Sequence, residues 1–139
     1  MRIRIVGRGI LVATLGLSAL GFGTAHAQGD TTPPTIAFTT QQGATIVNLP
    51  QEFPPDTIET KIRGTATDDL SGVTVVTVDL RGPVHEGGLA DQSCDAGNLN
   101  CTWSYSPPFI SLPGEYTVTA TAFDADGNSA STTTTIELL

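Results

Sequence analysis

GEYTVTATAFDADGN, residues 114–128, is the stretch of sequence that decides the fold. Apolar side chains at every second position from Tyr116 to Ala122 alternate with threonines, which is the period of a β-strand with one packed and one solvated face. Gly114 follows a proline and starts the strand sharply, and the closing DGN supplies the positive-φ position of a hairpin turn. The stretch therefore predicts a strand, a tight turn and a last strand over residues 129–138.

The chain before this stretch shows the same alternation of short β-branched runs with glycine and proline turns. No helical periodicity follows the first residues, so the composition favours an all-β protein. We expect a two-sheet, immunoglobulin-like Greek-key sandwich of about seven strands, with another Greek-key arrangement as the alternative. The remaining strands are expected over residues 35–39, 45–49 (a short edge strand), 58–67, 73–80 and 101–106.

Two irregularities are expected within this pattern. Val73 and Val75 are out of phase with the apolar residues that follow them, so their strand carries a bulge or buries both faces. Residues 82–100 contain five glycines and prolines, which preclude a long regular element there.

The first residues have the pattern of a secretory signal peptide. Arg2, Arg4 and Arg8 precede an uncharged run, and the sequence Ala-His-Ala ending at Ala27 offers the small residues that a signal peptidase reads. We therefore expect a signal peptide over residues 1–27 and one domain over residues 28–139. The alternative is a membrane anchor, but the apolar run is shorter than the ~20 residues that a spanning helix needs.

Charge excludes two classes of partner. The chain of 139 residues has a net charge of −8, and removal of a leader with three of the six basic residues leaves three against fourteen acids, or −11. Such a charge argues against nucleic acid and against an anionic membrane surface, and it is compatible with divalent cations. We expect a secreted or periplasmic protein without stable membrane insertion after signal removal.

The two cysteines, Cys94 and Cys101, are expected to form a disulfide in an oxidising compartment. A bridge around so short a loop stabilises by about 2.5 kcal/mol in the chain-entropy model. The alternative is a redox-active pair, but such pairs usually have two intervening residues beside a helix.

At the level of motifs, PPTI, GTATDDLSGV, CTWSY and PGEYTVTATAFDADGN occur in this order. The motifs and their order resemble those of the bacterial immunoglobulin-like modules of exported and surface proteins. The resemblance covers nearly all of residues 30–138 and implies the sandwich fold, with Trp103 and the strand start at Gly114 and Tyr116 as fold-signature residues. Tyr116 resembles the tyrosine corner of such sandwiches, whose hydroxyl bonds to nearby backbone.

Acidic residues at the ends of two strands are the leading candidate site. In an immunoglobulin-like order their loops lie at the same end of the sandwich, where the extended segment 30–34 with Asp30 is also expected. Calcium takes six to eight oxygen ligands, so such a group suits a weak calcium site. The alternative is turn chemistry, in which Asp and Asn bond their own backbone. The candidate ligands are Asp68, Asp69, Asp124, Asp126 and Asn128.

Other candidate sites each have a structural alternative. Trp103, Tyr105 and Phe109 suit either an aromatic platform or a core. His85 and Glu86 are the only suspects for catalysis, since no GxSxG motif or histidine cluster is present. We expect a non-enzymatic, secreted module with a binding or structural, adhesion-type role toward an unknown protein or a surface glycan. The alternative is an exported enzyme or inhibitor that uses residues 82–100.

Overall fold

The computed structural model describes residues 29–47, 60–108 and 112–139. The fold that follows is that of the compact unit Thr31–Leu139. The predicted signal peptide over residues 1–27, and also Phe109, lie outside the described residues.

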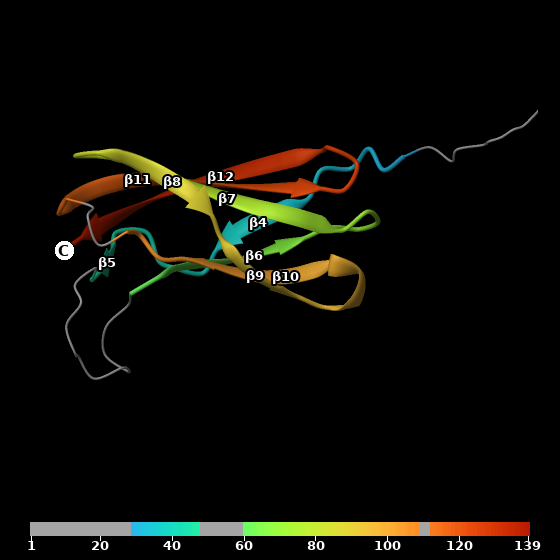
Figure 1. Ribbon diagram of the computed structural model, residues 1–139, viewed down its shortest axis with the longest axis horizontal. Coiled ribbons are helices and arrows are strands. Elements are labelled where there is room, and N and C mark those ends of the chain that lie inside the picture. The colour runs from blue at the N-terminus through green and yellow to red at the C-terminus, as the bar shows by residue number, and fades with distance from the viewer. Residues whose placement is uncertain (1–28, 48–59, 109–111) are drawn as a thin grey trace, which may run out of the picture. The chain divides into compact units, whose positions relative to one another are not determined.

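Two β-sheets form a sandwich-like arrangement (Figure 1). One sheet has the strand order β4-β6-β10-β9, and the other has the order β5-β12-β11-β7-β8. Neighbouring strands are antiparallel, apart from β5 and β12, which are parallel. The prediction of an all-β, two-sheet sandwich is confirmed. The strands are Thr35–Phe38 (β4), Ala44–Ile46 (β5), Ile62–Thr67 (β6), Val73–Arg81 (β7), His85–Leu89 (β8), Asp91–Cys94 (β9), Asn100–Tyr105 (β10), Gly114–Asp124 (β11) and Ser129–Leu138 (β12).

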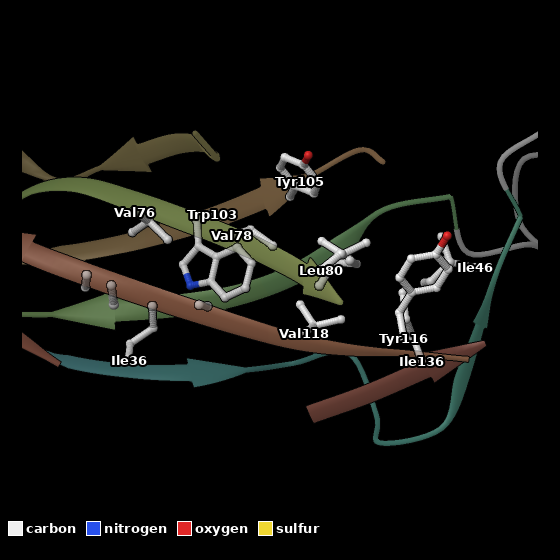
Figure 2. Packing of buried hydrophobic residues seen from close by; sticks show 14 of the residues in the cluster. Ile36, Ile46, Val76, Val78, Leu80, Trp103, Tyr105, Tyr116, Val118 and Ile136 are labelled. Atoms are coloured by element: carbon white, nitrogen blue, oxygen red, sulfur yellow. The ribbon is translucent and has the colours of Figure 1, made fainter. Parts of the chain in front are cut away.

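Strand β11 has the alternation that its sequence predicts. Its apolar residues from Tyr116 to Ala122 are fully buried, whereas the threonines between them are exposed or half-buried. Burying one aliphatic or aromatic side chain stabilises by roughly 1.5–3 kcal/mol, so one face of this strand supplies a large part of the core. Tyr116 is paired with Ile136 of β12, and Figure 2 labels both among the buried residues of the core.

Trp103 of β10 belongs to the core and is not an exposed platform. Its side chain is 2% exposed, its ring meets the edge of Phe38 at a centroid distance of 5.5 Å, and its Nε1 donates to the Thr65 carbonyl. Glycine at position 64 is required by this packing, because a Cβ there would overlap the indole of Trp103 and the carbonyl of Ala37.

The predicted irregularity of β7 is a bulge. Val73 pairs with Asp124 and Val75 pairs with Phe123, so the register shifts and Thr74 is the extra residue. The Thr74 hydroxyl donates to the backbone carbonyls of Phe123 and Asp124, at 3.1 and 3.2 Å. The bulge lets Val73 and Val76 both point into the core.

The segment 82–100 has no long regular element, as expected, but it holds two short strands that the sequence did not predict and a 3-10 turn, η2, at Ala96–Asn98. Strand β8 pairs with β7 in one sheet, and β9 pairs with β10 in the other, so the chain changes sheets at Ala90. Glycines weaken a strand but still pair through their backbone. These two strands raise the number in the described part of the chain from the expected seven to nine.

Candidate functional site: the acidic end

Three loops meet at one end of the sandwich, and together we call them the acidic end: residues 68–72, 95–99 and 124–128. The amide of Ala125 donates to the carbonyl of Gly72 at 3.1 Å, and the amide of Asp68 donates to the carbonyl of Leu99 at 2.9 Å. Gly72 has a φ of 88°, and a Cβ at this position would lie 2.5 Å from the carbonyl oxygen of Gly97. The loops are therefore packed against one another through their backbones.

In the loop after β11, Asp124 organises the turn. This side chain is 4% exposed, and its Oδ1 accepts from the amides of Asp126 and Asn128 at 2.9 and 2.8 Å. Its Oδ2 accepts from the side-chain amide of Asn128 at 2.7 Å. Both carboxylate oxygens of Asp124 are thus bonded within the turn, and Asn128 directs its amide nitrogen at Asp124. Asp126 is exposed.

The loop between β9 and β10 repeats this arrangement with Asp95, a residue that the sequence analysis missed. Its Oδ1 accepts from the amides of Leu99 and Asn100, and its Oδ2 accepts from the side-chain amide of Asn100. The hydrogen bond from Asn100 is the main reason that the pKa of Asp95 lies below its ordinary value. An Asp followed five residues later by an Asn across a glycine turn is the sequence signal that would have identified this pair.

The loop after β6 is different, because Asp68 uses only one of its two oxygens. Its Oδ2 accepts from the amides of Leu70 and Gly72 at 3.1 and 2.7 Å, and from the Ser71 hydroxyl at 3.4 Å. Its Oδ1 is buried and has no hydrogen-bond partner in the described part of the chain. The whole residue is 9% exposed, and Asp69 beside it is exposed. A buried carboxylate oxygen without a hydrogen-bond partner lowers the stability of the fold. A ligand that binds Oδ1 of Asp68 would therefore stabilise the folded state.

The other predicted residues fall into structural roles. Cys94 and Cys101 form the predicted disulfide across β9 and β10, with their Cα atoms 4.0 Å apart. The Tyr116 hydroxyl donates to the carbonyl of Leu112 at 2.7 Å, and Gly114 has a φ of 140°. The disulfide holds the loop of Asp95 closed, and the Tyr116 bond closes the opposite end of β11.

His85 and Glu86, the suspects for catalysis, are adjacent on β8. The His85 side chain is 56% exposed, and its Nε2 lies 2.6 Å from Oδ1 of Asp79. Arg81 donates to the other oxygen of Asp79 at 2.9 Å. The hydrogen bond with His85 is the main reason that the pKa of Asp79 lies below its ordinary value. Neighbouring residues of a strand point to opposite faces, so the side chains of His85 and Glu86 project from opposite faces of β8.

Comparisons with known proteins identify no family. No protein-family model matches the chain, and no curated protein matches it. A crystal structure of an engineered protein is similar, with a TM-score of 0.45 and 21% identity over 88% of this chain. The match covers 21% of that engineered protein's length. In the part of the chain that the structure describes, no helix has the length and apolar character needed to cross a membrane.

Proposed function

We propose that the protein is an exported immunoglobulin-like module with a binding or structural role, whose acidic end takes a calcium ion. The strand orders support the immunoglobulin-like assignment, since they correspond to the ABED sheet and the GFC sheet of such sandwiches, with short additional edge strands. The disulfide and the signal-like leader support export, because disulfides persist in oxidising compartments.

The calcium proposal is carried by one observation, the buried Oδ1 of Asp68 that has no hydrogen-bond partner among the described residues. Asp69 adds an exposed carboxylate on the next residue. Asp124 and Asn128 already bond each other. Of the remaining three predicted ligands, Asp68 and Asp69 offer carboxylate oxygens within 4.8 Å of one another, so they are the central pair. Backbone oxygens and waters would complete the six to eight ligands of calcium.

The calcium ion in this proposal strengthens the acidic end as a contact surface. It neutralises carboxylates in a chain of net charge −8, and it adds a ligand for an oxygen that otherwise lies buried without a bond. Since bound calcium stabilises only the folded state, its effect appears as a higher midpoint of unfolding.

The experiment is a thermal melt of the mature domain with its disulfide intact, in excess chelator and then in millimolar calcium. The midpoint is expected to rise by several degrees in calcium. Asp68→Asn should abolish the rise, because the amide keeps its one oxygen for the loop bonds and places an NH2 group, which cannot ligate calcium, where Oδ1 lies. Asp69→Asn should reduce it.

Asp91→Asn is the matched control, since it removes one exposed carboxylate from β9, outside the three loops of the acidic end. This variant should keep the full calcium response. Superimposed melts of the unmodified protein in chelator and calcium would overturn the calcium site. A response that Asp91→Asn removes as completely as Asp68→Asn would also overturn it, because the effect would then follow total charge.

A further inference from the structure

The outer face of the sheet β4-β6-β10-β9 is a second surface, independent of the acidic end. The strand register places small polar residues in rows across it. Ser104 lies between Arg63 of β6 and Asp91 of β9, and Thr102 lies between Thr65 and Ser93. Side chains paired across strands project on the same face, so a guanidinium and a carboxylate stand on either side of a central line of hydroxyls.

This face is hollowed where the small side chains lie. A cavity of about 350 Å³ is lined by residues of all four strands or their ends, including Thr39, Arg63, Asp91 and Ser104. A second hollow of about 260 Å³ adjoins it and shares Thr39 and Arg63 in its lining. The two hollows therefore adjoin each other at Arg63. The larger of the two has the size of small-molecule sites in proteins.

The chemistry of the lining selects the class of ligand. Hydroxyls of Ser and Thr both donate and accept, the Arg63 guanidinium only donates, and the Asp91 carboxylate only accepts. One positive and one negative side chain give the hollow no net charge, whereas the chain carries −8, so an anionic ligand is disfavoured by the field of the protein. A cationic ligand gains from Asp91 but is opposed by Arg63. The lining fits a neutral ligand that is itself rich in hydroxyls.

We propose that these joined hollows bind a neutral oligosaccharide, with sugar units lying across β6, β10 and β9. Arg63 and Asp91 hold ring hydroxyls from opposite sides, and Thr102 and Ser104 form the floor. Trp103 is 2% exposed and offers no ring face for stacking, so recognition rests on hydrogen bonds and the affinity is in the millimolar range. This inference names partner chemistry at a face that the calcium proposal does not use.

Amide chemical shifts of the ¹⁵N-labelled mature domain test it, with maltose, cellobiose and N,N′-diacetylchitobiose each added up to high millimolar concentration. At least one disaccharide is expected to give saturable shifts confined to β6, β9 and β10. Asp91→Asn and Arg63→Gln should each weaken that binding at least fivefold. Thr102→Val keeps the shape of the side chain and should weaken it less, because one hydroxyl is lost.

Asp68→Asn is the matched control, since it alters the acidic end and should leave the sugar response intact. The two proposals therefore fail separately. The absence of saturable shifts with all three disaccharides would overturn the glycan site. Shifts that survive in the Arg63→Gln, Asp91→Asn double variant would overturn it as well. Triglycine, a zwitterionic peptide, is added in parallel, and binding of triglycine in place of the sugars would assign the hollow to peptides and contradict the proposal.

Discussion

The loops at residues 124–128 and 68–72 begin with the same feature, a buried aspartate at the end of a strand, but they use it differently. Asp124 bonds through both oxygens, because Asn128 supplies a backbone amide to one and a side-chain amide to the other. Asp68 has no asparagine in its loop, and its Oδ1 stays without a hydrogen bond among the described residues. In the loop 124–128 both oxygens of the aspartate are hydrogen-bonded, whereas in the loop 68–72 one buried oxygen has no hydrogen bond among the described residues.

The loop of Asp95 shows that this difference comes from one residue type. Asp95 repeats the bonding of Asp124, with Asn100 in the place of Asn128. Two of the three loops of the acidic end are therefore closed by an Asp and Asn pair. An acidic residue at a strand end is thus evidence for a cation site only when its own loop leaves an oxygen unbonded.

Removing the aspartate of the complete loop should have the largest effect. Asp124→Ala takes the acceptor away from two partly buried backbone amides and from the side-chain amide of Asn128, so we expect a loss of roughly 3 kcal/mol in the free energy of unfolding. Urea unfolding measures it, and the loss should be the same in chelator and in calcium. A loss below about 1 kcal/mol would mean that the turn does not depend on Asp124.

Two substitutions of Asp68, in the loop 68–72, should distinguish the contributions of its two carboxylate oxygens to stability. Asp68→Ala removes the acceptor of Leu70 and Gly72 and should cost about 2 kcal/mol in chelator. Asp68→Asn keeps one oxygen for those amides and should cost less than about 0.5 kcal/mol in chelator. Urea unfolding of both variants checks the contrast, and equal losses would show that Oδ1 matters as much as Oδ2 without calcium.

The asparagine that completes the first loop should have a smaller effect. Asn128→Ala removes the side-chain amide from Oδ2 of Asp124 but leaves the two backbone bonds to Oδ1, so we expect a loss of about 1 kcal/mol. If Asn128→Ala also creates a new calcium response in the thermal melt, the comparison of the two loops is strengthened. A loss as large as that of Asp124→Ala would contradict the division of roles between the two oxygens.

The smallest effect is expected in the exposed loop of Asp95, and it depends on pH. The hydrogen bond from Asn100 lowers the pKa of Asp95, so the folded state favours the carboxylate, and this stability is present above the unfolded pKa. It is lost as the pH falls through the folded pKa. Asn100→Ala should therefore be less stable than the unmodified protein at about pH 7, and the difference between their free energies of unfolding should narrow toward about pH 2. If this difference in the free energy of unfolding does not change with pH, the loss of stability comes from packing and not from the hydrogen bond to Asp95.

Much of the fold could be predicted because it depends on local pattern. The alternation in β11 and the phase break at Val73 have direct physical meanings, and the structure contains the corresponding strand and bulge. The two cysteines close a loop short enough to suggest pairing, and they are bonded. The strand β8 could not be predicted, because two of its five residues are glycines and the other three show no apolar alternation, so it is recognised only through its pairing with β7.

The sequence by itself determined the all-β fold class, the disulfide, and the strand ends at Asp68 and Asp124, because each follows from residues close together in the chain. Only the tertiary structure decided which aspartate oxygen is left without a bond, and that a glycine at position 64 lies over Trp103. The hollow between Arg63 and Asp91 also appears only in the folded sheet. These features depend on distances between residues far apart in sequence, and register and packing set those distances.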